Sequence, residues 1–187
     1  MPRGAVTPDL RRRAKTIVFG VAYGMSEFGL AAQLGIGKAE AKTYIEQYYA
    51  KYPNVRQYML DIVAQCRRDG YVTTIMNRRR YIPEVLTRNR PIREAAERTA
   101  INTPIQGSTA DIIKTAMVTL GREVLPRHPE VLMTLHVHDE LLFEGPEPAA
   151  RGIAAEVRRV MEEAFPLKVP LRVDLRLGQN WRDMEPL

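Results

Sequence analysis

The sequence of 187 residues has one cysteine, one tryptophan and no hydrophobic run that approaches 18 residues. A single cysteine, Cys66, excludes an internal disulfide, so we expect a buried or neutral helix residue in an intracellular, cytoplasmic protein. Without a long apolar run or a signal-peptide pattern, the sequence predicts no membrane partner. It also has no internal repeat and no low-complexity linker.

The charge of the chain is unevenly distributed. The net charge is +6, with 45% hydrophobic and 27% charged residues, typical of a soluble globular protein of one large or two small domains. Residues 1–24 carry five Lys/Arg and one Asp, giving +4, and residues 67–98 carry nine Arg and four acids, giving +5. The remainder therefore sums to −3. Two basic clusters favour a polyanionic partner, nucleic acid first, over scattered solubilising charge.

Helical periodicity and stop signals predict several helices. A first helix begins after the N-cap Thr7 and carries Met25 on its apolar side. The other helical segments are 38–52, a helix capped by Asn54 that ends at Gly70, two stretches within 91–125 hinged near Pro104 and Gly107, and 148–165.

Alternating segments predict short strands between these helices. The expected strands are 71–76 and 80–82 around a turn at Asn77, then 131–137, 141–144 and 171–177. Helices combined with a small antiparallel sheet of hairpins indicate the α+β class.

A stripe of four side chains runs along the first predicted helix. Arg11, Lys15, Phe19 and Tyr23 are spaced by four, and each step of four advances only about 40° around a helix. Two cations at one end and two rings at the other match the order of phosphates, sugar and base in a nucleoside triphosphate. The alternative is a solvated basic face above an ordinary core.

Adjacent carboxylates occupy the tip of a predicted hairpin. Asp139 and Glu140 lie between stiff apolar flanks and suit a hard cation such as Mg²⁺. A plain Asp-containing turn is the alternative. His136 and His138 form a His-x-His pair, but no third His or Cys lies nearby to complete a zinc site.

Arg98, Asn102 and Gln106 share one helix face if the helix persists that far. Their donors can reach the minor-groove acceptors that every base pair offers, so such contacts sense pair geometry without reading sequence. A buried polar network that stabilises the bend at Pro104 is the alternative reading.

Four co-linear motifs give the chain a family resemblance over residues 5–185. They are the Arg11-x-x-Ala14-Lys15-x-x-x-Phe19-Gly20-x-x-Tyr23-x-x-Ser26 run, the Arg78 to Pro83 run, the Thr103 to Gly107 core with Ala110 to Ile113, and the Val137 to Glu140 turn. In this order and spacing they resemble bacterial DNA polymerase I-type (family A) enzymes. The resemblance implies helical fingers over 1–70 and the C-terminal part of the palm over 71–187.

For the incoming dNTP, the resemblance implies a role for each residue of the stripe. Arg11 would contact the terminal phosphates, and Lys15 the phosphates nearer the reacting atom, where it would protonate the departing pyrophosphate. Phe19 would stack on base and sugar, and in this family Phe here favours deoxy over dideoxy substrates. Tyr23 would guard the template-base pocket.

The resemblance also implies DNA and metal contacts. Arg98, Asn102 and Gln106 would line the nascent minor groove and template. His138 would touch the primer end, and Asp139 would bind Mg²⁺ of a two-metal site with support from Glu140. The expected activity is DNA-directed DNA polymerisation on primer-template DNA.

Two departures from the family pattern stand out. His136 replaces a residue that is often Gln, and the 187 residues contain no match to the Asp-Tyr-Ser-x-Ile-Glu-Leu-Arg motif that supplies the other metal-binding aspartate. The resemblance places that strand, the thumb and any exonuclease domain upstream. We therefore expect the isolated chain to be nearly inactive. The alternatives are a non-catalytic nucleotide- or DNA-binding fragment, and half of a split polymerase complemented by an upstream half.

Overall fold

The structure, a computed structural model, describes residues 5–187. The chain forms two compact units, Met1–Gly107 and Ser108–Leu187, which we describe separately. Within the described residues there are six α-helices and three two-stranded antiparallel sheets, so the α+β prediction is confirmed. The expected division into fingers and palm at residue 70 is functional and stays a prediction. None of the helices in residues 5–187 is long and apolar enough to cross a membrane.

The first unit opens with the predicted basic helix, α1 (Pro8–Ala22). The hydroxyl of Thr7 accepts a hydrogen bond from the Leu10 N–H at 3.2 Å, which confirms the predicted cap. The expected continuation to Met25 is wrong, because Gly24 adopts a left-handed φ of 74° and turns the chain. Ser26 then caps α2 (Glu27–Leu34) by accepting from the Gly29 N–H.

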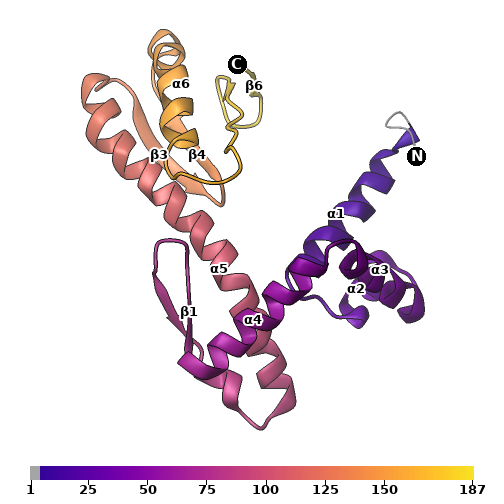
Figure 1. The fold of residues 1–187 in the computed structure, drawn as a ribbon. Helices are drawn as coiled ribbons and strands as arrows, with labels where there is room; N and C mark the ends of the chain where they lie inside the picture. Colours follow the sequence, from indigo (N-terminus) through magenta and orange to yellow (C-terminus); the bar gives the residue numbers. More distant parts are fainter. Residues whose placement is uncertain (1–4) are drawn as a thin grey trace. The chain divides into compact units, whose positions relative to one another are not determined.

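Two longer helices complete this helical part (Figure 1). α3 (Lys38–Lys51) agrees with the prediction, and α4 follows as Pro53–Asp69. The prediction that Asn54 caps α4 is wrong: Pro53 fits the first helical position without a backbone donor, so Asn54 lies inside the first turn. α4 ends at Gly70, which has a φ of 79°.

A hairpin follows α4, as predicted, with shorter strands. β1 (Tyr71–Thr73) pairs with β2 (Arg79–Tyr81), and Asn77 in the turn has a φ of 61°, a conformation that asparagine tolerates. A 3₁₀ turn, η2 (Pro83–Leu86), leads on to α5.

The hairpin, α4 and the start of α5 share a small apolar core. Its buried members are Cys66, Val72, Ile82, Val85, Ala96 and Ala100. Cys66 is 0% exposed, as expected of a buried helix residue. Burial raises the pKa of its thiol, with a smaller contribution from the charge of Asp69, so the thiolate is disfavoured.

α5 (Arg90–Thr119) is one helix, and the predicted hinge near Pro104 and Gly107 is wrong. Pro104 lacks an N–H and removes one backbone hydrogen bond, while the surrounding turns stay helical. Tertiary packing keeps this stretch of α5 helical, because the neighbouring residues Ala100, Ile101 and Thr103 are buried.

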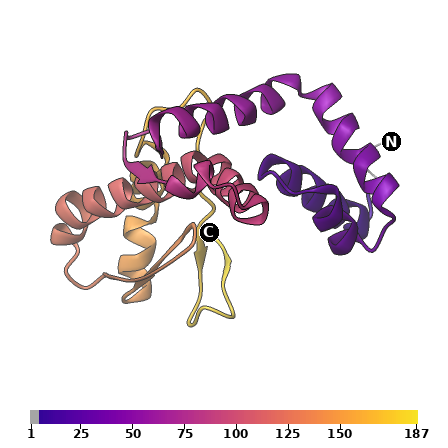
Figure 2. The same cartoon turned by 90° about the horizontal axis from the view of Figure 1, so that it is seen from below.

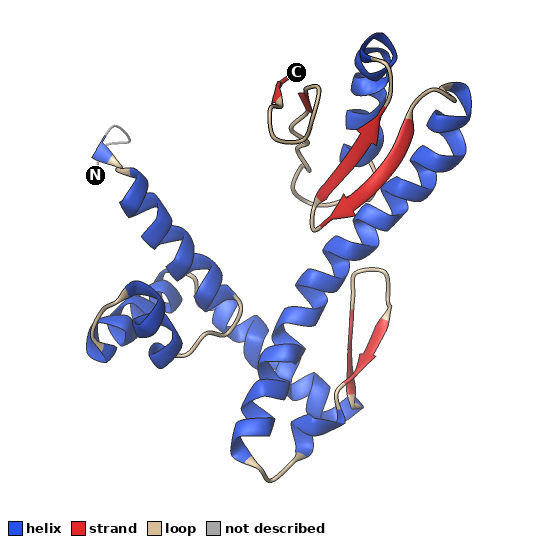
Figure 3. Cartoon of the chain, turned by 180° about the vertical axis from the view of Figure 1, so that it is seen from behind, coloured by secondary structure: helices blue, strands red, loops and turns tan. Residues whose placement is uncertain are grey.

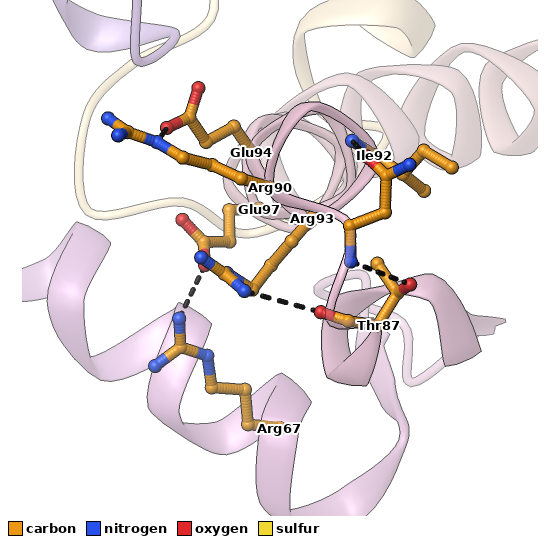
Figure 4. Close-up of polar contacts among 8 residues, drawn as sticks. Arg67, Thr87, Arg90, Ile92, Arg93, Glu94 and Glu97 are labelled. Carbon is orange, nitrogen blue, oxygen red and sulfur yellow. Dashed lines mark hydrogen bonds and ion pairs between the residues drawn. The ribbon is translucent and has the colours of Figure 1, made fainter.

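Ion pairs anchor the first turns of α5 in the first unit (Figure 4). Arg67 of α4 pairs with Glu97, whose carboxylate also lies 3.8 Å from Arg93. Arg93 in turn donates to the carbonyl oxygen of Thr87 at 3.3 Å. Four arginines of the 67–98 cluster are thereby committed to acidic neighbours: Arg67, Arg68, Arg90 and Arg93.

The second unit begins within α5 and places a hairpin against a helix. After the turns η3 (Leu120–Val124) and η4 (Leu125–Arg127), β3 (Leu132–Val137) pairs with β4 (Glu140–Glu144). α6 (Glu147–Glu162) lies along this hairpin in two views (Figures 1 and 3).

Apolar packing holds this unit together, and its last strand is shorter than predicted. The core contains Leu120, Val124, Val131, Ile153, Val157 and Val160. The predicted strand over 171–177 is paired only at β5 (Arg176–Leu177), which adjoins β6 (Glu185–Pro186) near the C-terminus (Figure 2). The remainder of 171–177 is not part of a sheet, because no neighbouring strand lies there to complete a ladder.

Candidate nucleotide- and DNA-binding residues

α1 presents the first three residues of the predicted stripe to solvent. Arg11, Lys15 and Phe19 are exposed and lie four residues apart on one helix, so they point the same way. Phe19 is 56% exposed, whereas Gly20 and Val21 on the other side of α1 are buried. An apolar ring left in water beside two cations is available to stack on a ligand.

The cations of α1 differ in how they are used. Arg12 pairs with Asp9, one turn earlier, and a nitrogen of Arg13 lies 4.0 Å from a carboxylate oxygen of Glu40. Within residues 5–187, Arg11 and Lys15 have no ion-pair partner. The two cations that the stripe assigns to phosphates are therefore the ones that remain free.

Tyr23 lies at the end of the stripe but outside the helix, which corrects the expectation of one continuous helical face. It is the C-cap residue of α1, with a φ of −100°, and is half-buried. At the next residue, Gly24, an added Cβ would lie 3.3 Å from Ile101 Cδ1 and 3.7 Å from Arg98 Cγ. The turn therefore packs on α5 and brings the end of the stripe beside Arg98.

A pocket of about 350 Å³ lies between the β1–β2 hairpin and α5. Its lining contains no carboxylate and consists of Thr74, Arg78, Arg79, Arg80, Thr99, Asn102, Thr103, Gln106 and Gly107. The structure thus brings Asn102 and Gln106 together, while Arg98 lies outside the pocket. Asn102 Oδ1 is buried with no hydrogen-bond partner in the described part of the chain. Such an atom costs about 1–3 kcal/mol unless a ligand or water donates to it.

In the second unit, the predicted acidic turn joins β3 to β4. Asp139 and Glu140 are exposed, and His138 adopts a φ of 55° that turns the chain tightly. A ring nitrogen of His136, Nε2, lies 2.8 Å from the His138 carbonyl oxygen and donates to it when protonated. The two carboxylates line an open pocket of about 510 Å³ that also contacts α6 and the C-terminal segment.

The chemistry of this turn suits Mg²⁺, but the number of ligands is small. Carboxylate oxygens are the donors that Mg²⁺ prefers, and this ion keeps several waters. Within residues 5–187, however, no three His, Cys, Asp or Glu side chains are grouped so as to hold a metal. Asp139 and Glu140 could hold Mg²⁺ together with oxygens from another segment or a substrate. A zinc site built on His136 and His138 lacks its further ligands.

Comparison with known proteins accounts for this combination of features. The family described as DNA polymerase family A matches residues 1–183, nearly the whole chain. The chain belongs to DNA polymerase family A. The match spans α1, the hairpin, α5 and the acidic turn, so family membership confirms the resemblance drawn from the four motifs.

Relatives within family A are similar in sequence and structure. DNA polymerase I of Mycobacterium leprae is 50% identical over 181 residues, and that of Geobacillus stearothermophilus is 47% identical over 178 residues. These alignments cover 97% and 95% of this chain but 20% of each relative. The POL domain of Pol1 from M. smegmatis, solved with DNA primer-template and dNTP, matches with 49% identity and a TM-score of 0.86. That match covers 92% of this chain and 30% of the other.

Sequence reasoning gave no role to several groups that the structure brings to the pocket, although two of them, Arg80 and Thr103, lie within the quoted motifs. Thr99 and Thr103 line it from α5, and Arg80 reaches Thr103 from β2 with a donor–acceptor distance of 3.3 Å. A signal was present, because residues 79 and 80 of a strand must face opposite sides. Which of the two side chains shares the face of Val72 and reaches Thr103 depended on the register of the hairpin.

Proposed function

We propose that this chain supplies the nucleotide-binding helix and the C-terminal palm of a DNA-directed DNA polymerase. The reaction is template-directed transfer of a dNTP to a primer 3′ end. The observation that carries the proposal is the exposed stripe of α1, in which Arg11 and Lys15 have no ion pair among the described residues 5–187 and Phe19 is 56% exposed. Family membership and similarity to a domain solved with primer-template and dNTP support it.

The stripe binds the triphosphate and positions it. Arg11, in the first turn of α1, lies where both its guanidinium and the helix N-terminus attract the terminal phosphates. Lys15, one turn on, neutralises the phosphates nearer the reacting atom and donates a proton to the departing pyrophosphate. Phe19 stacks on base and sugar, and Tyr23 borders the template-base pocket beside Arg98.

The pocket between hairpin and α5 contacts the nascent duplex. Asn102 and Gln106 present amides to minor-groove edges, where Asn102 Oδ1 can accept from a base donor such as the guanine amino group. Arg98 contacts the template from the neighbouring position on α5. These contacts report the shape of a base pair more than its identity.

The acidic turn forms one side of the metal site. Asp139 binds Mg²⁺, Glu140 supports the site, and His138 touches the primer end. When bound, Mg²⁺ ions lower the barrier to phosphoryl transfer by neutralising charge on the attacking and leaving oxygens. Because no third acidic or histidine ligand groups with this turn within residues 5–187, we propose that another segment supplies the remaining carboxylate.

Primer extension tests the proposal. The chain is assayed alone and mixed with a polypeptide carrying the Asp-Tyr-Ser-x-Ile-Glu-Leu-Arg segment of a family A relative. We expect extension only in the mixture. Robust extension by the chain alone would contradict the need for a further carboxylate. Binding of dNTP and DNA without extension in either case would favour the second candidate, a non-catalytic binding fragment.

A further inference from the structure

Two neighbouring arginines of the hairpin, Arg79 and Arg80, leave it in different directions. Arg80 lies opposite Val72 in the β1–β2 register, so the two side chains share a face, and Val72 is buried in the core with Ala96 and Ala100 of α5. Arg79 lies opposite Thr73, on the other face, where its guanidinium carbon sits 4.8 Å from the centre of the Tyr71 ring. Arg80 is therefore directed along the face of the hairpin that carries Val72 and packs on α5.

Arg80 is joined to α5 by a chain of two hydrogen bonds. Its Nη1 donates to Thr103 Oγ1 at 3.3 Å, and the same hydroxyl donates to the Thr99 carbonyl oxygen at 2.7 Å. Thr103 is only 7% exposed, so water has little access to replace either bond. A hydroxyl that both accepts and donates in this way has a fixed orientation.

A second contact holds the hairpin at the same level of α5. A Cβ added to Gly107 would lie 2.6 Å from Thr74 Cγ2, so the end of β1 approaches the helix backbone more closely than any other residue would allow. Thr103 and Gly107 are one turn apart, and each follows directly after one of the two amides of the pocket lining, Asn102 and Gln106. The hairpin is thus fixed at two points beside the two amides.

We propose that Arg80 is a positioning residue, which with Thr103 and the Thr74–Gly107 contact holds the hairpin on α5 and so sets the orientation of Asn102 and Gln106. A basic run in a DNA-binding protein would ordinarily be assigned to phosphate contacts. The geometry assigns Arg80 to the protein itself. The consequence for DNA binding rests on the proposed function of the pocket, whereas the link between hairpin and helix does not.

Hydrogen exchange of the 187-residue chain without DNA tests the link. Thr103→Val keeps the shape of the side chain and removes the hydroxyl, while Thr103→Ser keeps the hydroxyl. We expect amides of residues 71–82 to exchange on the order of tenfold faster in Thr103→Val, and at the wild-type rate in Thr103→Ser. Thr43→Val is the matched control, because the Thr43 hydroxyl also donates to a carbonyl four residues earlier and accepts from no arginine of the described residues. Wild-type exchange in Thr103→Val would overturn the proposal.

Salt-dependent binding of primer-template DNA tests what Arg80 does. We expect Arg80→Met and Thr103→Val to weaken binding by about fivefold at fixed salt, with an unchanged slope of log affinity against log salt. A slope reduced by about 0.9 in Arg80→Met would mean that Arg80 neutralises a phosphate, and the assignment would be wrong. If the wild type does not bind DNA at all, the proposed function fails, and the exchange measurement still decides whether the link exists.

Discussion

Replacing Gly107 with alanine sets two effects of opposite sign against each other. Gly107 lies inside α5, where alanine is intrinsically favoured over glycine by about 1 kcal/mol. The new methyl, however, would lie 2.6 Å from Thr74 Cγ2, which belongs to a stiff, β-branched and 6% exposed side chain. Overpacking of this kind costs about 1–3 kcal/mol. We therefore expect a net destabilisation of roughly 0–2 kcal/mol.

The effect of Gly107→Ala should change from destabilising to stabilising when the clashing methyl of Thr74 is removed. Thr74→Ser deletes Cγ2 and keeps the oxygen that accepts from the Arg78 N–H at 3.2 Å. In that background Gly107→Ala should stabilise the first unit by up to about 1 kcal/mol, because only the helix preference remains. The double-mutant cycle should accordingly give a coupling energy of about 1–3 kcal/mol between the two positions.

Denaturant unfolding with two optical probes can measure this separately for each unit. All eight tyrosines lie within residues 1–107, and the single tryptophan, Trp181, lies in the second unit. Gly152→Ala in α6 is the control, since its added Cβ would have no described atom within 4 Å beyond its chain neighbours and the adjacent helical backbone, and it should stabilise the second unit by up to about 1 kcal/mol. Stabilisation by Gly107→Ala in the wild-type background, or additivity of the two changes, would refute the reasoning.

Four further outcomes are expected. In a mixture that extends primers, Lys15→Ala should slow the chemical step by about 10²–10⁴-fold while DNA affinity changes little; equal losses in both would contradict its role as a proton donor. Phe19→Tyr should increase incorporation of dideoxynucleotides in the same assay, and unchanged discrimination would argue against a ring beside the sugar. DNA affinity should fall with salt with a slope of about −0.9 per phosphate contacted, and a flat response would exclude the basic clusters as the binding surface. Cys66, buried with a raised pKa, should react with a thiol reagent only after unfolding, and rapid modification of the native chain would show that α4 opens locally.

The sequence predicted helices and turns best where local chemistry decides them. Thr7 and Pro8 fix the start of α1 because a hydroxyl and a missing N–H suit a helix N-terminus, and Asn77 marks the hairpin turn because it tolerates a positive φ. Prediction failed where tertiary packing overrides the local signals. Pro104 and Gly107 indicated a hinge, yet α5 runs through both because burial of the residues beside them holds the helix.

In the candidate site, too, the sequence predicted some features and the tertiary structure decided others. Spacing alone placed Arg11, Lys15 and Phe19 on one face. It could not tell that Arg12 and Arg13 pair with acidic neighbours, while Arg11 and Lys15 have no ion-pair partner in the described part of the chain. Likewise, the net charge of residues 67–98 gives each arginine the same weight, whether or not it is ion-paired. Ion pairs with residues up to 30 positions away decide which of them remain available.

By itself, the sequence determined the family, the order of the elements and the residue types that can bind a triphosphate. These features depend on the identity of the residues and their spacing along one chain. The tertiary structure alone decided that Gly24 turns the stripe onto α5, that Arg80 faces Thr103 while Arg79 faces Tyr71, and that Gly107 admits Thr74. Each of those outcomes depends on the register of one element against another. Register is set by burial and close approach between segments distant in sequence, and no local pattern encodes it.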